Sequence, residues 1–427
     1  MMFTRPRGTR DILPDEMERR RRAEAILRDV FQSFGYREVQ TPVFEHLELI
    51  TAKSGEEIKE HLYSFEDKSG RKLALRPELS APTIRLYVNE LRTRPKPRKL
   101  CYFENCFRYE RPQKGRYREF WQAGVELIGS RRPEAEAEVI ALAVRCLEEI
   151  GLERYALVIG NRGIFRALFD HYNISEDVQN TIFHLMDKRD LQGLQRYLDA
   201  GDITEEARDF LWRLVKVIDR GRGIGVVELE EGLTDRARGI VETELEGFKE
   251  LTGYLGDFGV RDYEIDFLIA RGLDYYTGMV FEIHAEGLGA QNQICGGGTY
   301  SLARLFGGGD VPSCGFAFGF DRLMLALDAQ EGDSEKQAIP RVFVAPASKK
   351  VLNRAIEIST LLRRSISCTM EIMGRKLDKA LSYADSEGIP YVVIVSEEVK
   401  GDSVILRDMR TGEQRVIKIE EVPDAVG

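Results

Sequence analysis

Aromatic rings and arginines alternate between Phe107 and Phe120, where the chain reads FRYERPQKGRYREF. An arginine side chain pairs with a phosphate or carboxylate through two parallel hydrogen bonds, and it also stacks on aromatic rings. If two strands joined by this basic loop bring Arg108 and Phe120 to a common site, the charge of Arg108 would bind one side of a nucleotide. The ring of Phe120 would stack on its other side. The alternative is an ordinary charged hairpin, which is common.

The familiar phosphate-binding loops do not occur in the sequence. It contains neither GxxxxGKS/T nor a GxGxxG run after a predicted strand, and the run CGGGTY at 295–300 lacks a lysine that could reach phosphates. A nucleotide would therefore be held mainly by side chains. Further arginines that could do so stand in RGLDYY at 271–276 and in GFAFGFDR at 315–322.

Three segments resemble the motifs of class II aminoacyl-tRNA synthetases. Arg108-Tyr-Glu with Phe120 is similar to motif 2, and Gly315–Arg322 is similar to motif 3, in which a glycine-rich strand leads to an arginine on a helix. Pro42, after a predicted helix and strand, is similar to the motif 1 proline at the dimer interface. The class I signatures HIGH and KMSKS are absent from the sequence.

Other stretches resemble histidyl-tRNA synthetases in particular. They are the two histidine signatures Arg271–Tyr276 and Gly296–Tyr300, and the motif 2 loop Arg111–Arg118 (RPQKGRYR). In the tail, the runs LRD at 406–408 and TGEQ at 411–414 resemble that family's anticodon-binding domain. The resemblance covers almost the whole chain.

This resemblance implies an enzyme that activates L-histidine with ATP and transfers it to the 3′-terminal adenosine of tRNA(His), with Mg²⁺ on the phosphates. Histidine would be bound by Glu78, Ser80, Arg108, Gln122, Glu126, Arg271, Tyr275, Tyr276 and Tyr300. ATP would be bound by Arg108, Arg116, Phe120 and Arg322. Arg271 and Arg108 would be catalytic, Arg111 and Gln113 would contact the tRNA acceptor end, and no residue is assigned to a metal.

The chemistry of these side chains suits a histidine substrate. Glu78 offers a carboxylate to the α-ammonium group, while Ser80 and Gln122 add two hydrogen-bond acceptors. A neutral imidazole needs one acceptor and one donor, which Glu126 and Tyr276 can supply. A buried site that bonds both ring nitrogens should reject amino acids that lack them.

Arg271 would stabilise the charge that develops on phosphorus when the histidine carboxylate attacks. For Tyr275 and Tyr276 the alternative is a structural role as half-buried aromatics of a sheet. Two other protein classes remain possible at this point. A synthetase-like regulatory subunit of ATP phosphoribosyltransferase typically lacks the anticodon domain and parts of the catalytic set, and a class II synthetase for proline or threonine would lack RGLDYY.

The predicted elements form an α+β fold, an antiparallel sheet flanked by helices. Helices are predicted at Pro14–Phe34, Glu78–Leu91 and Pro133–Ile150, and another begins at Asp321. Strands are predicted at Tyr36–Thr41, Leu62–Phe65, Lys72–Leu75, Leu100–Arg108 and Arg118–Ile128. Glycine-rich turns are predicted around Gly272, Gly296–Gly298 and Gly307–Gly309.

These elements predict a catalytic domain at 1–330, with a helical insertion at about 170–255. A polar linker at 331–337 (EGDSEKQ) would lead to a small α/β anticodon-binding domain at 338–427, where strands and helices alternate. Pro42 and its surroundings imply a homodimer through the resemblance.

The composition fits a cytoplasmic globular protein. The net charge is −9, yet residues 92–118 hold ten Lys/Arg against two Glu, a local excess that suits polyphosphate or RNA, or else a solvated loop. The six scattered cysteines form no CxxC pair, as expected for reduced thiols. We expect neither a secretory signal nor a membrane partner, because the N-terminal residues and the rest of the sequence lack the apolar runs that these require.

Overall fold

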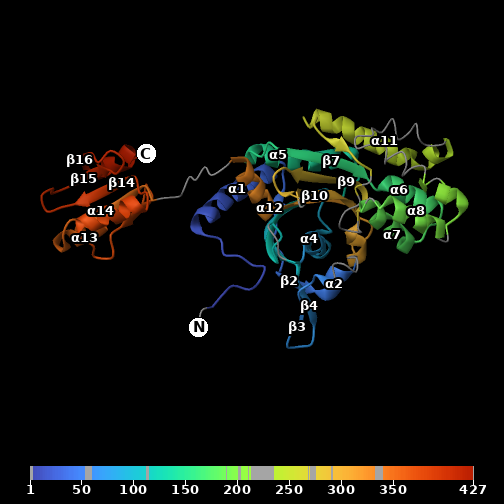
Figure 1. Cartoon of the computed structure of the whole chain (residues 1–427), viewed down its shortest axis with the longest axis horizontal. Coiled ribbons are helices and arrows are strands. Elements are labelled where there is room, and N and C mark those ends of the chain that lie inside the picture. The colour runs from blue at the N-terminus through green and yellow to red at the C-terminus, as the bar shows by residue number, and fades with distance from the viewer. Residues whose placement is uncertain are drawn as a thin grey trace. The chain divides into compact units, whose positions relative to one another are not determined.

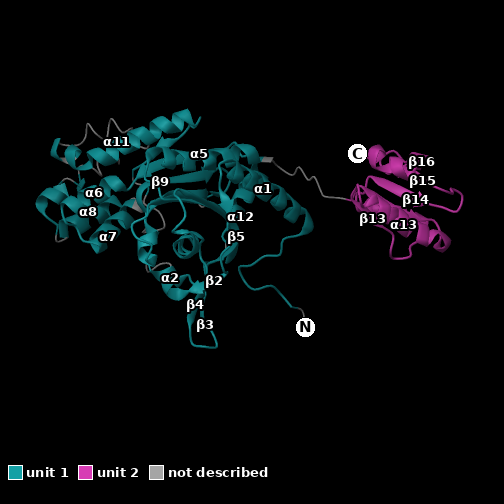
Figure 2. Ribbon diagram, turned by 180° about the vertical axis from the view of Figure 1, so that it is seen from behind, with its two compact units in different colours: residues 1–334 teal, residues 335–427 magenta. Residues whose placement is uncertain are grey.

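The computed structural model describes residues 3–52, 60–111, 115–188, 190–200, 203–209, 211–212, 235–267, 269, 276–289, 292–331 and 340–426. The chain divides into a large unit, Met1–Ser334, and a small unit, Glu335–Gly427 (Figure 2). Each unit has its own hydrophobic core.

The large unit is built on an eight-stranded sheet with the order β1-β5-β6-β11-β10-β9-β7-β8. Its strands are β1 (Arg37–Glu38), β5 (Arg98–Phe107), β6 (Glu119–Ile128), β7 (Tyr155–Asn161), β8 (Glu264–Ile265), β9 (Tyr276–Ala285), β10 (Gln293–Tyr300) and β11 (Ser313–Gly319). The six central strands pair antiparallel, and the short strands β1 and β8 pair parallel at the two edges. The predicted α+β fold with an antiparallel sheet is confirmed.

Helices cover this sheet. They include α1 (Pro14–Ser33), α5 (Pro133–Ile150), α11 (Asp235–Asp257) and α12 (Phe320–Glu331). In Figure 1, α1, α5 and α11 lie on one side of the sheet, and α4 (Ser80–Leu86) lies on the other. The bounds of α5 match the prediction because Pro133 stands in its first turn and Gly151 ends it in the left-handed conformation at φ 83°.

A three-stranded sheet, β2-β4-β3, lies beside α4 in the large unit. Its strands are β2 (Phe44–His46), β3 (Ser64–Glu66) and β4 (Lys72–Leu75), and α2 (Leu47–Thr51) follows β2. The strands predicted at Leu62–Phe65 and Lys72–Leu75 correspond to β3 and β4, which pair antiparallel, with Gly70 at φ 75° in the turn between them. The helix predicted from Glu78 begins at Ser80, because the Glu78 carboxylate accepts hydrogen bonds from the backbone N–H groups of Ser80 and Ala81. A π-helix, η1 (Tyr87–Leu91), continues α4 to the predicted end.

Two sequence predictions in this unit were wrong in detail. The strand predicted at 36–41 is only two residues long, since the N–H of Thr41 donates to the Glu104 carboxylate instead of a strand partner. Gly296–Gly298 form the middle of β10, not a turn. A Cβ at Gly297 would meet the Gly315 carbonyl at 2.6 Å, so glycine is needed there for close packing. Gly307 and Gly309 do form turns after η3 (Leu302–Phe306), and Gly272 lies outside the described residues.

Between β7 and β8, the described residues form mainly helices. Besides α11 these include α6 (Gly163–His171), α7 (Glu176–Asp187) and α8 (Leu191–Ala200). Their apolar faces belong to the same core as the large sheet, through residues such as Phe165, Phe169 and Phe248.

The small unit contains a five-stranded sheet of order β13-β12-β14-β15-β16. Its strands are β12 (Val342–Pro346), β13 (Cys368–Met370), β14 (Tyr391–Val395), β15 (Ser403–Asp408) and β16 (Gln414–Lys418). The first three strands in the sheet order are parallel to one another and the last two pair antiparallel, and the predicted α/β fold of this unit is confirmed.

Alternate residues of the small sheet pack on opposite helices. Val342 and Val344 pack with α13 (Leu352–Leu362), whereas Phe343 and Ala345 pack with α14 (Leu377–Ser386). The short elements of this unit are η4 (Lys349–Val351), η5 (Ile419–Glu421) and α15 (Val422–Val426). Within the described ranges of both units, no helix has the length and apolarity to cross a membrane.

Candidate active site

A cavity of about 620 Å³ opens in the large unit, within the size range of small-molecule sites. Parts of β6, β9, β10 and β11, the residues after β5 and the turn before α4 line it. The predicted site residues that line it are Glu78, Ser80, Arg108, Arg116, Phe120, Gln122, Tyr276, Tyr300 and Arg322. The sheet therefore brings together side chains that are as far apart in sequence as Glu78 and Arg322.

The other predicted site residues lie elsewhere or are not described. Glu126 is buried directly behind the lining, with only 1% of its surface exposed. Arg111 is exposed and does not line the cavity. Gln113, Arg271 and Tyr275 lie outside the described residues.

One end of the cavity is rich in guanidinium groups and aromatic rings. Arg108 stands with its Cζ 5.3 Å from the centre of the Phe120 ring, and its Nε donates to the Pro77 carbonyl at 2.9 Å. Arg116 forms an ion pair with Glu110. Burial, followed by the charge of Arg108, lowers the pKa of Arg116 below its usual range, so the two guanidinium groups are close enough to repel each other. An anion bound between them would be stabilised.

Arg322 spans this end of the cavity from the start of α12. Its Nε donates to the Gly115 carbonyl at 3.1 Å and its Nη1 donates to the Gln293 carbonyl at 3.1 Å. The side chain thus links the motif 2 loop to β10, and its planar group lines the same space as Phe120.

The neighbouring Asp321, which the sequence reasoning missed, fixes the start of α12. Its Oδ2 accepts from the N–H of Trp121 at 2.8 Å, and its Oδ1 accepts from Arg10 and Arg20, each at 2.8 Å. Adjacency to Arg322 is the one sequence signal that marks Asp321. Arg10 also stacks on Tyr117, a lining residue, at 4.7 Å from the ring centre.

The turn before α4 and strand β6 present buried hydrogen-bond acceptors to the same cavity. The Glu78 carboxylate is bonded to the N–H groups of Ser80 at 2.6 Å and of Ala81 at 3.0 Å. Burial raises the pKa of Glu78, although these hydrogen bonds and the charge of Arg108 oppose the rise. Gln122 accepts at Oε1 from the Cys106 thiol at 3.3 Å, which orients its amide.

Two tyrosines hold the Glu126 carboxylate. It accepts at Oε1 from the Tyr102 hydroxyl at 3.1 Å and at Oε2 from the Tyr300 hydroxyl. Burial raises the pKa of Glu126 to about 7, more than these hydrogen bonds lower it. Tyr276 packs edge-on against Tyr300, with ring centres 6.4 Å apart. Sequence reasoning assigned Glu126 and Tyr276 to the two imidazole nitrogens and missed Tyr102, which carries no motif that could have revealed it.

Comparisons with known proteins agree with this architecture. A model of the histidyl-tRNA synthetase family matches residues 8–323, and a model of the anticodon binding domain matches residues 341–427. The histidine–tRNA ligase of Archaeoglobus fulgidus is 47% identical over 424 residues, 99% of both chains. The crystal structure of apo histidyl-tRNA synthetase from S. aureus has a TM-score of 0.76 at 26% identity and covers 100% of both chains.

These matches and the fold define an aminoacyl-tRNA synthetase. Because the family model matches well over half of its length, the chain belongs to the histidyl-tRNA synthetase family. It is an enzyme that ligates histidine to tRNA.

One structural neighbour, from Bacillus halodurans, is described as an ATP phosphoribosyltransferase regulatory subunit/histidyl-tRNA synthetase. Its TM-score is 0.76 at 26% identity, over 93% of this chain and 99% of its own. The curated ligases are far more similar in sequence, and the chain has the anticodon-binding unit. The regulatory alternative is therefore not favoured.

Proposed function

We propose that this cavity performs both steps of the ligase reaction. Histidine and ATP would give histidyl-adenylate and pyrophosphate, and the terminal ribose of tRNA(His) would then take the histidyl group. The observation that carries this proposal is a single cavity whose lining combines guanidinium groups and aromatic rings with buried hydrogen-bond acceptors. The nucleophile of the first step is the histidine carboxylate, so positioning and charge neutralisation supply most of the rate.

Histidine would lie at the acceptor end. Glu78, Ser80 and Gln122 would surround its ammonium group. Glu126 would accept from one imidazole nitrogen, while the Tyr276 hydroxyl would donate to the other. Because the geometry places Tyr300 on Glu126, Tyr300 would orient the carboxylate that meets the ring.

ATP would lie at the arginine-rich end. Arg108 and Arg116 would bind its phosphates, and the adenine would lie between Phe120 and Arg322. Arg108 would also stabilise the charge of the reacting phosphate. We assign Arg271 to the same catalytic task, and Tyr275 to histidine, from the resemblance of their signature alone.

Mg²⁺ is expected with ATP. Among the residues that the structure describes, no group of three His, Cys, Asp or Glu side chains is arranged to hold a metal. Glu110 and Glu282 nevertheless line the cavity, and Mg²⁺ is usually held by one or two carboxylates together with substrate phosphates. The residues present therefore fit an ion that arrives on ATP and neutralises phosphate charge.

The tRNA would contact both units. Arg111 and Gln113 would meet the acceptor end, since Arg111 is an exposed cation on the motif 2 loop. The region 338–427 would read the anticodon, after a linker at 331–337. Within the catalytic domain, 1–330, the helical segment at about 170–255 would be an insertion between β7 and β8.

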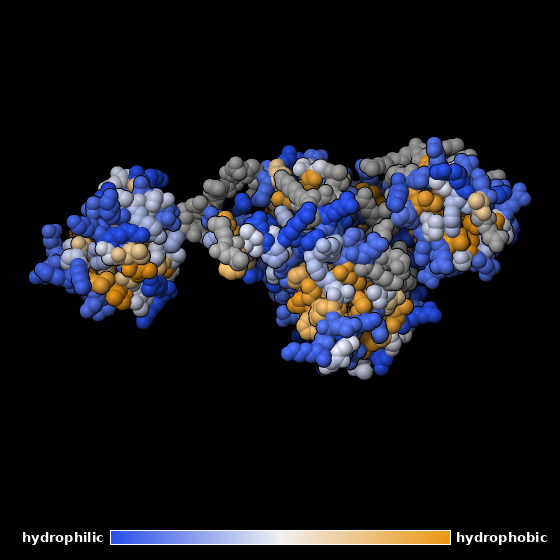
Figure 3. All heavy atoms as spheres, turned by 60° about the horizontal axis from the view of Figure 1, so that its bottom comes forward, coloured by the Kyte–Doolittle hydropathy of each residue, from blue (hydrophilic) through white to orange (hydrophobic). Residues whose placement is uncertain are grey.

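We further propose that two copies of the chain form a homodimer. Next to Pro42, the three-stranded sheet exposes Val43 by 41%, Phe44 by 51% and Phe65 by 43%. Figure 3 shows hydrophobic side chains gathered on this face of the large unit. A patch of this kind is typical of a protein interface. A cytoplasmic location would suit the six cysteines, all of them described and all free thiols.

Aminoacylation of a tRNA(His) transcript with radiolabelled histidine tests the proposal. The unaltered protein should charge the transcript, and Glu126→Gln should lower kcat/KM for histidine by roughly 100-fold or more, because the carboxylate is the acceptor for the ring. Arg111→Ala should raise KM for tRNA with little effect on adenylate formation. Equal charging by Glu126→Gln and the unaltered protein would refute the assignment of the histidine end.

A further inference from the structure

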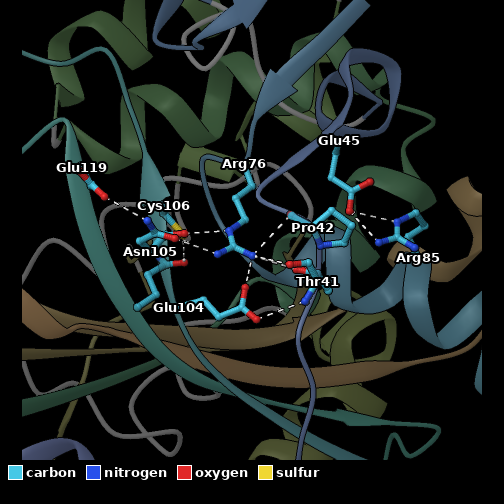
Figure 4. Close-up of polar contacts among 10 residues, drawn as sticks. Thr41, Pro42, Glu45, Arg76, Arg85, Glu104, Asn105, Cys106 and Glu119 are labelled. Carbon is cyan, nitrogen blue, oxygen red and sulfur yellow. Dashed lines mark hydrogen bonds and ion pairs between the residues drawn. The ribbon is translucent and has the colours of Figure 1, made fainter. Parts of the chain in front are cut away.

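Arg76 is a buried arginine that does not line the cavity but stands directly before the Pro77–Ser80 turn, which does. Only 2% of its surface is exposed. Figure 4 shows that its guanidinium group points into a network of oxygen atoms. None of the roles proposed above uses this residue.

The guanidinium group joins two other segments of the chain. Its Nε donates to the Asn105 carbonyl at 2.8 Å and its Nη2 donates to the Asn105 side-chain oxygen at 3.0 Å (Figure 4). Its Nη1 donates to the Thr41 carbonyl at 2.9 Å and to the Glu104 carboxylate. Arg76 thus ties the end of β5 to the segment that leads into β2.

The backbone of Arg76 continues the same connection. Its N–H donates to the Val43 carbonyl at 3.0 Å, and its carbonyl accepts from the N–H of Phe107 at 2.9 Å. One residue further on, the Pro77 carbonyl accepts from Arg108 Nε at 2.9 Å. The position of the turn therefore depends on the guanidinium group of Arg76 and also on its backbone N–H and carbonyl groups.

Glu104 balances the buried charge. It forms an ion pair with Arg76 and accepts from the N–H of Thr41 at 3.2 Å. Burial raises the pKa of Glu104, and the nearby guanidinium opposes that rise. A buried ion pair of this kind fixes geometry, because removing either partner leaves an uncompensated charge.

We propose that Arg76 is a positioning residue for the amino-acid end of the cavity: it holds the Pro77–Ser80 turn so that Glu78 faces the substrate ammonium group. This inference rests on the role proposed for Glu78. Glu78 itself bonds to Ser80 and Ala81 at the start of α4, so its place relative to β5 is set by Arg76 before the turn and by the bond from Arg108 to Pro77. Arg76 acts through Glu78 and touches no substrate.

The test compares Arg76→Lys with Arg85→Lys by histidine-dependent pyrophosphate exchange. Lysine keeps the charge opposite Glu104 but lacks the planar fork that binds both oxygens of Asn105. We expect KM for histidine to rise by about tenfold or more, with KM for ATP little changed. Arg85 is the matched control, because its ion pair with Glu45 joins β2 to α4 without touching the turn (Figure 4).

A histidine analogue without the amino group separates positioning from general structural support. The inhibition constant of imidazole-4-propionate should be the same for Arg76→Lys and the unaltered enzyme, since this analogue has no ammonium group for Glu78. Equal weakening of histidine and the analogue would overturn the proposal, as would an unchanged KM for histidine. If Arg76→Lys does not fold, Asn105→Ala, which removes one acceptor, should give a smaller change of the same kind.

The variant Glu78→Gln distinguishes this inference from the proposed function. If Glu78→Gln raises KM for histidine and Arg76→Lys does not, the result supports ammonium binding by Glu78 and contradicts the positioning role of Arg76. If Glu78→Gln leaves KM unchanged, the proposed ammonium site is wrong and the inference falls with it. The double variant should match Glu78→Gln alone, because one residue acts through the other, and additive effects would contradict this.

Discussion

At the scale of single residues, two buried glutamates provide a natural comparison. Burial raises the pKa of both Glu126 and Glu136 to about 7 from an ordinary value of 4.5. Glu126 bonds to Tyr300, a residue of the cavity lining, whereas Glu136 lies on α5 and accepts from Thr299, which does not line the cavity. Replacing either glutamate should change the stability of the protein to a similar extent, whereas only the replacement of Glu126 should lower its activity.

Replacing either glutamate with glutamine should stabilise the unliganded protein at high pH. Each carboxyl group keeps its proton up to about pH 7 in the folded protein but loses it near 4.5 when unfolded. The folded state therefore binds more protons, and stability falls as pH rises between these values. Thermal unfolding at pH 8 should show each variant more stable by roughly 1–3 kcal/mol, and the gain should vanish near pH 4.5.

The two glutamine variants should differ in their rate of histidine activation. Histidine activation should fall in Glu126→Gln and stay near the original level in Glu136→Gln. A comparable loss in both would mean that Glu126 acts by supporting the fold.

Sequence could predict the lining residues that belong to local motifs, such as Arg108, Phe120 and Arg322. It could not predict Tyr102 or Arg76, because their partners come from other strands and a single arginine or tyrosine carries no pattern. It also could not show that the Tyr300 hydroxyl bonds to Glu126, because the two residues lie on different strands. Two tyrosines, Tyr276 and Tyr300, are adjacent only in the β9–β10 register.

At the scale of elements, the site depends on neighbouring strands whose close packing requires glycine, because a Cβ would clash there. A Cβ on Gly315 in β11 would meet both the Val125 carbonyl and the Glu126 carboxylate at 2.2 Å. Sequence reasoning predicted turns at Gly296–Gly298 because glycine most often marks turns. The pattern of one chain segment cannot show what the neighbouring strand requires, whereas α5 was predicted to the residue because its start and stop signals are local.

Gly315→Ala should therefore damage the histidine end through the backbone. We expect a loss of stability of about 2 kcal/mol or more, and weaker histidine binding measured by calorimetry. Gly239→Ala is the control, since Gly239 is exposed in α11 with no atom within 4 Å of the added Cβ. It should be neutral or more stable by up to about 1 kcal/mol. Unchanged histidine binding in a folded Gly315→Ala protein would contradict the packing argument.

The segment before α1 contacts the part of the cavity where we propose that ATP binds. The carbonyl of Gly8 accepts from the N–H of Arg118 at 2.8 Å, and Arg10 joins Asp321 to Tyr117. Arg10→Ala should raise KM for ATP several-fold in pyrophosphate exchange while leaving KM for histidine nearly constant. Arg5→Ala serves as the control, because its ion pair with Asp11 is exposed. A rise in both KM values for Arg10→Ala would count against a local role.

At the scale of the whole molecule, the chain has a net negative charge although its substrate tRNA is also negatively charged. Residues 92–118 carry the basic excess, on β5 and the motif 2 loop, against a net charge of −9. KM for tRNA should rise by about tenfold or more between about 50 and about 200 mM salt, because counterions are released from the phosphates. Histidine-dependent exchange needs no tRNA and should change much less. Equal salt dependence of the two reactions would contradict a mainly electrostatic contact with RNA.

Homodimer formation also belongs to this scale. Phe44→Asp together with Phe65→Asp should reduce the molar mass measured by light scattering from that of a dimer to that of one chain, because charges would replace the exposed rings. Val416→Asp on the small unit, also exposed, should leave the mass unchanged. A dimer that survives the paired substitution would place the interface elsewhere.

The most direct test of the central claim is exchange of labelled pyrophosphate into ATP in the presence of each amino acid separately. The site described above predicts exchange with histidine, at a rate several orders of magnitude above that with amino acids that lack the imidazole. Arg108→Ala should abolish most of that exchange, because it removes a guanidinium group from the arginine-rich end. Exchange driven equally well by proline or threonine, or histidine binding without any exchange, would contradict the account.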